Sequence, residues 1–192
     1  MTETREPISE RFILLVVGRP ASGKTTISRT IAERWNLPIV AKDALKERLF
    51  DSVGTADRDW SRQLGRAAFS LLDYVIELQL QSGKPFVVDA AYDAKYENAK
   101  FQQWQQEYGF TAVQVHCVAR PEELVRRFAE RAAGGSRHPG HADQDSVEEF
   151  RATLDDGREE VLALDGPVLR YHNENHLSTE RLIGELTALL PR

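Results

Sequence analysis

A glycine-rich turn joins a strand-like segment to a helix-like segment near the start of the 192-residue chain. Residues 12–17 read Phe-Ile-Leu-Leu-Val-Val, an unbroken apolar run of strand length. Residues 18–25 read Gly-Arg-Pro-Ala-Ser-Gly-Lys-Thr and match G-x-x-x-x-G-K-[ST] at every fixed position. Residues 26–35 then have helical spacing. This order of strand, turn and helix predicts an α/β fold built around a phosphate-binding loop, the P-loop.

The residue types of this turn suit a phosphate chain. Backbone N–H groups of a wrapped loop and of the following helix N-terminus converge on a small volume and favour negative charge. Gly18 and Gly23 allow backbone angles that a Cβ would forbid. In this motif Lys24 reaches the β- and γ-phosphates and the Thr25 hydroxyl faces Mg²⁺. We therefore expect ATP and Mg²⁺ as cofactors. The expected nucleotide contacts are Gly18, Ala21, Ser22, Gly23, Lys24, Thr25 and Thr26.

Apolar runs alternate with helical patterns along the rest of the chain. Strands are expected at 12–17, 38–41, 86–90, 111–118 and 168–171. Helices are expected at 26–35, 44–50, 64–81, 95–108, from 121 onward, from 146 to about 163, and at 177–190. This alternation predicts an α/β fold, the P-loop NTPase three-layer sandwich, with a five-stranded parallel sheet and helices on both faces. The P-loop strand should lie near the centre, with ligands at the carboxyl ends of the strands.

The length fits a single domain over residues 1–192, with a flexible segment at 1–11. Residues 134–141 hold three glycines and a proline, which predicts a small lid at about 132–145. A formal net charge of −5 argues against broad nucleic-acid binding. No apolar run approaches the ~20 residues of a membrane span. The polar first residues lack a secretory signal, and the single cysteine, Cys117, suits a reducing cytosol. We expect a cytoplasmic protein in which Cys117 is buried and inert, with its oligomeric state open.

Two acidic residues follow apolar strands and are candidates for the chemistry. Asp89 ends the run Phe-Val-Val-Asp and is expected to hold the Mg²⁺ shell together with Thr25, although a turn or helix-start aspartate gives the same pattern. Asp43 follows the second strand, where a carboxylate can accept the proton of an attacking hydroxyl. Asp43 can equally cap the helix that follows it. Lys42 beside it is either a phosphate or substrate contact or an exposed lysine.

Cationic residues cluster before and inside the predicted lid. Arg127 and Arg131 lie four apart on one helix and so share a face. Arg137 follows in the loop. These cations can cover a triphosphate and neutralise charge on the transferred phosphoryl group, or they can pair with Glu123 and Glu130 on a solvated face. His138 and His141 flank Pro-Gly, and without a further nearby ligand we discount zinc there. The candidate acceptor contacts are Lys42, Asp43, Tyr92, Arg137 and His138.

The combination of these segments resembles the small P-loop kinases related to chloramphenicol phosphotransferase, to zeta-toxin-type kinases and to the AAA_33 set. The matching stretches are 18–25, 42–51, 87–89 and 127–131. The resemblance implies an ATP-dependent phosphotransferase in which Asp43 orients or deprotonates the acceptor. It also implies that Arg131 and Arg137 act from the lid, that Arg127 lies near adenine or the phosphates, and that residues 173–175 pass close to adenine. The expected catalytic residues are Lys24, from the P-loop pattern, with Asp43 and Arg131.

The acceptor does not follow from the resemblance. The chain lacks the Gly-Asp-Gly-Asp of shikimate kinases and the Asp-Gly-x-Pro-Arg of adenylate kinase. We expect a small molecule with a hydroxyl group. Three alternatives stay open at this point. They are a polynucleotide 5′-hydroxyl kinase, which needs a basic and aromatic groove, a toxin acting on nucleotide sugars, and a non-catalytic module regulated by nucleotide.

Overall fold

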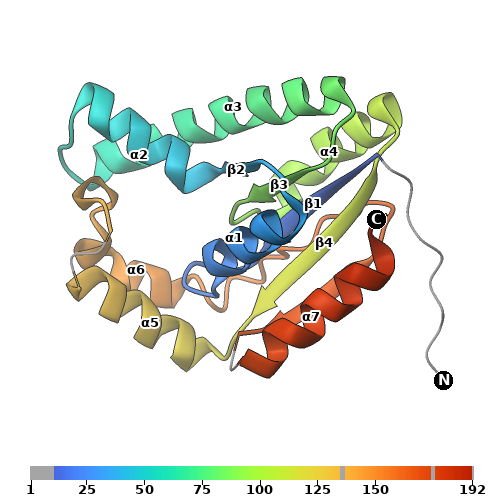
Figure 1. The fold of residues 1–192 in the computed structure, drawn as a ribbon. Coiled ribbons are helices and arrows are strands. Elements are labelled where there is room, and N and C mark those ends of the chain that lie inside the picture. Colours follow the sequence, from blue (N-terminus) through green and yellow to red (C-terminus); the bar gives the residue numbers. More distant parts are fainter. Residues whose placement is uncertain (1–10, 135–136, 174–175, 192) are drawn as a thin grey trace.

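A computed structural model describes residues 11–134, 137–173 and 176–191 (Figure 1). Its centre is a five-stranded sheet in the order β2-β3-β1-β4-β5, and every neighbouring pair is parallel. The strands are β1 (Phe12–Val17), β2 (Ile39–Ala41), β3 (Phe86–Asp89), β4 (Thr111–Val118) and β5 (Val168–His172). The P-loop strand β1 is therefore central, and the predicted parallel sheet is confirmed.

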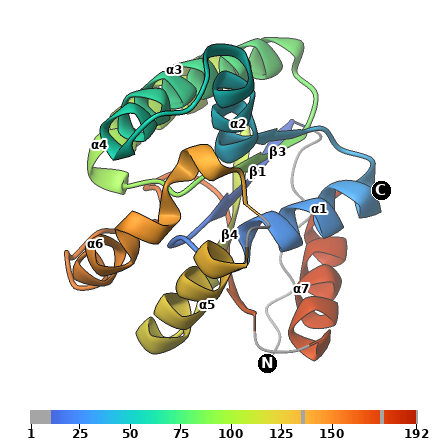
Figure 2. The ribbon, with the colours of Figure 1, turned by 90° about the vertical axis from the view of Figure 1, so that its left-hand side faces the viewer.

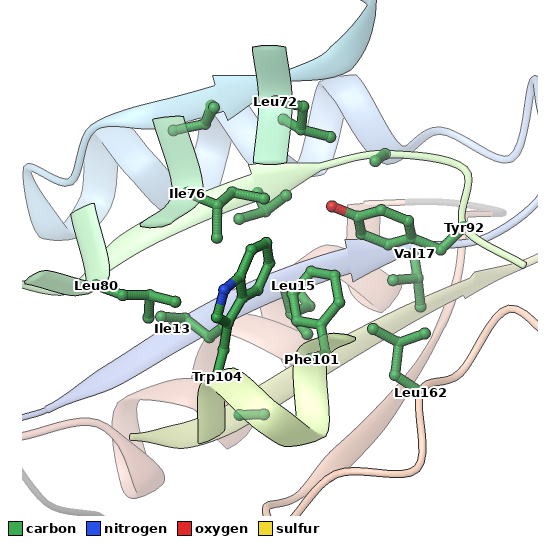
Figure 3. Packing of buried hydrophobic residues seen from close by; sticks show 14 of the residues in the cluster. Ile13, Leu15, Val17, Leu72, Ile76, Leu80, Tyr92, Phe101, Trp104 and Leu162 are labelled. Atoms are coloured by element: carbon green, nitrogen blue, oxygen red, sulfur yellow. The ribbon is translucent and has the colours of Figure 1, made fainter. Parts of the chain in front are cut away.

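Helices cover both faces of this sheet, which gives three layers. On one face, α3 (Arg58–Ser82) and α4 (Ala94–Tyr108) pack on Ile13, Leu15 and Val17 of β1 (Figure 3). On the other face, α1 (Lys24–Trp35) and α7 (His176–Leu189) pack on Leu14 and Val16. All six residues of β1 are buried. A parallel strand covered on both faces must be apolar throughout, which explains the unbroken apolar run in its sequence.

The remaining helices extend beyond the carboxyl ends of the strands. They are α2 (Lys42–Val53), α5 (Pro121–Ala133) and the short α6 (Val147–Ala152), with two 3₁₀ turns, η1 (Pro139–His141) and η2 (Asp143–Ser146). Figure 2 shows α2 and α3 on one side of these ends and α5 and α6 on the other. The expected lid region corresponds to the end of α5 and the 3₁₀ turns.

Helix α6 ends at Ala152 and not near residue 163, so it is much shorter than predicted. Its N-cap residue, Ser146, makes no side-chain capping hydrogen bond, since Ser146 Oγ donates back to the carbonyls of Ala142 and Asp143. The following segment instead runs beside β4. The side-chain amide of Gln114 exchanges two hydrogen bonds with the Leu162 backbone, both of 2.8 Å. The N–H and C=O groups of Leu162 are therefore not available for the hydrogen bonds that a longer helix would need.

Two other helix boundaries also differ from the predictions. Helix α3 begins at Arg58, six residues before Leu64, because Asp57 accepts a hydrogen bond of 2.9 Å from the Trp60 backbone N–H and caps it. Helix α2 starts directly after β2, at Lys42. Cys117 is 1% exposed, and burial raises the pKa of its thiol to about 12, as expected for an inert thiol. No helix among the described residues is both long and apolar enough to cross a bilayer.

Tyr92 belongs to the core and not to an acceptor pocket, which corrects the expectation for this residue. Its ring is 1% exposed and lies 5.3 Å from the ring of Phe101 (Figure 3). The cause is the chain direction after β3, which leads the tyrosine beneath α3 and α4. The Tyr92 hydroxyl has no hydrogen-bond partner among the described residues.

We predict that Tyr92→Phe leaves the free energy of unfolding unchanged or raises it by about 1 kcal/mol, since it removes a buried hydroxyl that lacks a partner. Tyr92→Ala should instead lower it by about 3–5 kcal/mol, because it opens a cavity between two helices and the sheet. Chemical denaturation of both variants measures this. A large loss of stability in Tyr92→Phe would contradict the packing described for the hydroxyl.

Candidate nucleotide and acceptor site

The register of the parallel strands brings three functional segments to one edge. Asp89, the last residue of β3, lies opposite Val16 of β1 on one side and Ala41 of β2 on the other. The P-loop begins at Gly18, directly after β1, and Asp43 is the second residue after the end of β2. They border a cleft of about 1080 Å³ that is also lined by α3, α5 and the lid segment. These segments meet at the carboxyl ends of the strands, where the sequence analysis expects ligands.

The P-loop backbone needs glycine at its two fixed positions. Gly18 has φ +140°, and a Cβ there would lie 2.4 Å from the carbonyl oxygen of Cys117. Gly23 has φ +96°, and its Cβ would lie 2.1 Å from Nδ2 of Asn173. Ala21 between them also has a positive φ, of 64°, which is uncommon for a residue with a Cβ. Strain of this kind is typical of ligand-binding loops.

The start of α1 offers unpaired donors to an anion. The helix begins at Lys24 without a side-chain cap and without an acidic residue in its first turn. Its first N–H groups are therefore free to bind a ligand, and the helix dipole favours negative charge there. Ser22 is fully buried, and its Oγ has no partner among the described residues. These features fit a phosphate group held by residues 18–26.

Lys24, Thr25 and Asp89 form a polar group at the base of the cleft. Lys24 Nζ donates to the Arg19 carbonyl at 2.8 Å, and burial lowers the pKa of Lys24 while Asp89 and Asp43 act against this shift. Thr25 Oγ1 donates to Asp89 Oδ2 at 2.8 Å. Burial also raises the pKa of Asp89, which is 6% exposed, although Lys24 and Thr25 oppose this.

This pair of oxygens fits Mg²⁺. The ion usually takes only one or two protein ligands when phosphate oxygens and waters complete its shell. Thr25 and Asp89 supply one hydroxyl and one carboxylate side by side. The described residues contain no group of three or more acidic, histidine or cysteine side chains that could form an all-protein cage.

Asp43 lies in the first turn of α2 and does not cap it, since the N-cap is Ala41. Its carboxylate accepts hydrogen bonds from Arg137 Nη2 at 2.8 Å and from Lys42 Nζ at 3.3 Å. Burial raises the pKa of Asp43, but Lys42, Arg137 and His141 outweigh this and hold it well below its usual range. Asp43 is therefore ionised wherever the protein is folded near neutral pH.

Arg131 and Arg137 line the cleft and share one acidic partner. Asp143 accepts from Arg131 Nη2 at 3.3 Å and pairs with Arg137 Nε at 2.9 Å. Burial, followed by the neighbouring Arg137, lowers the pKa of Arg131. Arg127 pairs with Glu123 and donates to the Asn173 carbonyl at 2.8 Å. The anticipated Arg127–Glu123 pair is thus present, whereas Arg131 pairs with Asp143 and not with Glu130.

Of the two histidines in this segment, His141 and not His138 lines the cleft, which corrects the expectation for His138. His138 stacks on the ring of Phe50 at 5.1 Å, faces Asp51 and does not line the cleft. His141 lines the cleft, is 3% exposed, and has its Nδ1 3.0 Å from Arg137. Burial and Arg137 lower the pKa of His141 to about 3, so it is neutral. His138 is held outside the cleft because its ring stacks on Phe50, whereas His141, in the 3₁₀ turn, meets the same ring edge-on at 5.6 Å.

Sequence reasoning missed Arg19 beside the cleft and four cations that line it, which are Arg29, Lys46, Arg58 and Arg158. Arg19, at a variable position of the P-loop, donates to the Thr153 carbonyl at 2.7 Å and pairs with Asp156 and Glu160. It ties the loop to the segment after α6. Lys46 stands four residues after Lys42, and this spacing was the signal available for it. Of the expected adenine segment, Asn173 lines the cleft, while 174–175 lie outside the described residues.

The fold and the loop together define a P-loop nucleotide-binding protein of the kinase type. A family model described as an AAA domain, AAA_33, matches residues 13–156. A protein of Chloroflexus aurantiacus, described provisionally as a kinase, is 32% identical, with a TM-score of 0.82 over 95% of this chain and 100% of its own. The chain therefore belongs to the AAA_33 family.

More distant solved structures share the fold. Chaetomium thermophilum Kti12, solved with ADP-AlF3, is 17% identical, with a TM-score of 0.63 over 94% of this chain and 100% of its own. A shikimate kinase from Acinetobacter baumannii, solved with shikimate, is 15% identical, with a TM-score of 0.52 over 95% of this chain and 97% of its own. A search of curated proteins found no match to this sequence.

We predict that Gly23→Ala abolishes measurable binding of Mg-ATP, because the new Cβ displaces Asn173 and strains the start of α1. Gly109→Ala is the matched control. Gly109 also has a positive φ, of 62°, but nothing lies within 4 Å of the Cβ that would be added. Isothermal titration calorimetry should show normal nucleotide affinity in the control. Equal affinities in the two variants would argue against the assigned nucleotide site.

Proposed function

We propose that the protein is an ATP-dependent phosphotransferase that moves the γ-phosphoryl group to a hydroxyl of a small molecule in the cytoplasm. One observation supports this most directly. The ionised carboxylate of Asp43 lines the same cleft as Lys24 and the Thr25–Asp89 pair. A nucleotide-binding protein needs the phosphate loop alone, whereas a kinase also needs a group that orients an acceptor beside it.

In the proposed reaction the acceptor oxygen bonds to the γ-phosphorus as the bond from that phosphorus to the β–γ bridging oxygen breaks, and ADP leaves. Bound Mg²⁺, held by Thr25 and Asp89, would offset negative charge on the phosphates. Lys24 and the loop N–H groups hold those phosphates. Asp43 accepts a hydrogen bond from the acceptor hydroxyl and receives its proton as the new bond forms.

The depressed pKa of Asp43 favours orientation over early deprotonation. A weakly basic carboxylate removes a proton poorly from a free alcohol, since efficient proton transfer needs a base with a pKa near the working pH. In a loose phosphoryl-transfer transition state, however, the hydroxyl proton leaves late. The main contribution of Asp43 is then the alignment of the attacking oxygen, which also gives a large rate effect.

The lid arginines complete the proposed site. Arg137 now bonds to the Asp43 carboxylate, so an acceptor hydroxyl must share or replace that bond. Arg131 and Arg127 stand on α5 with their side chains in the cleft wall. Cations at this place would stabilise charge that spreads over the transferred phosphoryl group. Closure of the lid would exclude water, which otherwise competes with the acceptor for ATP.

A transfer screen tests the function itself. The protein is incubated with Mg-ATP and a panel of hydroxylated metabolites and antibiotics, and phosphorylated products are detected by mass spectrometry. We expect one class of hydroxyl compound to be phosphorylated much faster than ATP is hydrolysed. Tight ATP binding without transfer to any small molecule would favour the regulatory module, and transfer to an oligonucleotide would favour the polynucleotide kinase.

With the acceptor from that screen, Asp43→Asn should lower kcat by about 10²–10⁴-fold and leave the affinity for Mg-ATP nearly unchanged. Asp51→Asn is the control, because Asp51 lies on the same helix, is exposed and does not line the cleft. Steady-state kinetics with calorimetry measures both quantities. Full turnover in Asp43→Asn would refute the role given to this carboxylate.

Arg131→Ala should lower kcat by about tenfold or more while changing ATP affinity much less, because its charge serves the transition state more than the bound nucleotide. Arg126→Ala, on the same helix, should behave like the wild type, since Arg126 pairs with Glu123 and Glu130 away from the cleft. An equal loss of turnover and of nucleotide affinity in Arg131→Ala would mean that the arginine acts only in ground-state binding.

A further inference from the structure

Lys46 is a buried cation without a carboxylate partner at the acceptor side of the cleft. It lies on α2, is 5% exposed and still lines the cleft. Its Nζ donates to Ser61 Oγ at 2.8 Å and lies 5.2 Å from the centre of the Phe50 ring. Among the described residues, it makes no ion pair within 4.0 Å. An ammonium buried without a counter-ion is costly, so this position is unusual unless a ligand supplies the charge.

The surroundings of Lys46 are cationic as well. Lys42, Arg58 and Arg137 all line the same part of the cleft. Burial, together with Lys42, Arg58 and Arg137, lowers the pKa of Lys46 to about 8, although Asp43 opposes this shift.

The acidic groups near Lys46 already have other partners. Asp43 accepts from Lys42 and Arg137, and Glu149 accepts from Arg58. Glu47 lies 3.0 Å from His141 Nε2. Each of these carboxylates is thus engaged elsewhere, and none forms an ion pair with the buried ammonium.

A purely structural role does not explain why the side chain at position 46 carries a charge. Ser61 Oγ accepts from Lys46 and itself donates to the His141 carbonyl at 3.2 Å, which links α2 and α3 to the lid. A neutral donor could make the same link without the cost of burying a charge. Two of the three ammonium donors of Lys46 have no hydrogen-bond acceptor among the described residues, and the cleft beside them is open to a ligand.

We propose that the phosphoryl acceptor carries an anionic group, a carboxylate or a phosphate, that binds Lys46 while its hydroxyl lies at Asp43. This rests on the proposed function, because it names the acceptor class of that site. Asp43 and Lys46 are three residues apart on α2, so their Cβ atoms are about 5–6 Å apart on one face. The hydroxyl and the anionic group of the acceptor should therefore be separated by about one helical turn. Small hydroxy acids and sugar phosphates have this size.

The first test measures anion binding without catalysis. The full chain is saturated with Mg²⁺ and a non-hydrolysable ATP analogue, so that added anions do not compete for the P-loop. Inorganic phosphate, and separately acetate, is then titrated at constant ionic strength while NMR follows the ¹³Cε signals of the lysines. The Lys46 signal is assigned by its loss in Lys46→Met.

We expect phosphate or acetate to shift the Lys46 signal and to raise its titration midpoint above about 8. Because only the protonated lysine pairs with an anion, the affinity should fall as the pH rises through that midpoint. Binding of phosphate but not of acetate would identify an acceptor that carries a phosphate group. Acetate binding as tightly as phosphate would identify an acceptor that carries a carboxylate. A Lys46 signal that responds to neither anion would overturn the proposal, and this measurement is made on the wild-type chain once the signal is assigned.

Variants test the same proposal through the affinity for the anion and through the kinetics of phosphoryl transfer. Lys46→Met should weaken anion binding by about 30-fold or more, since it removes the buried charge. Lys84→Met, an exposed lysine before β3, should bind like the wild type. With the acceptor from the screen, Lys46→Met should raise the acceptor KM by a similar factor and leave the KM of ATP unchanged. Equal anion affinity in Lys46→Met and wild type would contradict the proposal.

The two proposals fail in different ways. Anion binding at Lys46 without phosphorylation of any compound would support the anion site and contradict the proposed kinase activity. Efficient phosphorylation of a neutral acceptor, with the same acceptor KM in wild type and in Lys46→Met, would support the kinase activity and contradict the anionic acceptor.

Discussion

The parallel pairing of β2, β3 and β1 is the constraint on which the rest of the structure depends. This register sets Ala41, Asp89 and Val16 side by side at one edge of the sheet. The chain leaves that edge as the P-loop after β1 and as α2 after β2. A shift of the pairing would separate the phosphate loop from both carboxylates. The apolar core on both faces of β1 is what holds this register, because every residue of the strand is buried.

The balance of charge within the cleft follows from that geometry. Cations come from the P-loop, from α2 and from the lid, and the carboxylates between them are few and shared. Asp143 alone pairs with both Arg131 and Arg137. Such an arrangement favours binding of a negatively charged triphosphate over water, because cations that are removed from water gain most from an anionic ligand. On the acceptor side, Lys46 likewise forms no ion pair with a carboxylate in the part of the chain that the structure describes.

The features that the sequence predicted well are those with a local cause. The P-loop pattern predicted the strand, the turn and the helix after it, although α1 begins at Lys24 and not at residue 26. The apolar runs located the five strands. Asp89 was found because it ends such a run. The end of α6 was missed because its helical pattern lost to hydrogen bonds with β4, a tertiary effect. Tyr92 and His138 were misplaced since the direction of a side chain after a turn depends on backbone angles that composition does not reveal. Lys46 was missed because its burial arises only where α2 packs on α3.

The account makes one central claim, that the loop 18–25 wraps a triphosphate whose terminal phosphate faces Asp43. A crystal structure with Mg²⁺ and a non-hydrolysable ATP analogue measures this directly. The account predicts the β- and γ-phosphates against Lys24 and the N-terminus of α1, with the γ-phosphate and the Asp43 carboxylate bordering one space large enough for a hydroxyl. A nucleotide bound away from this loop, or an Asp43 carboxylate turned out of the cleft, would contradict it.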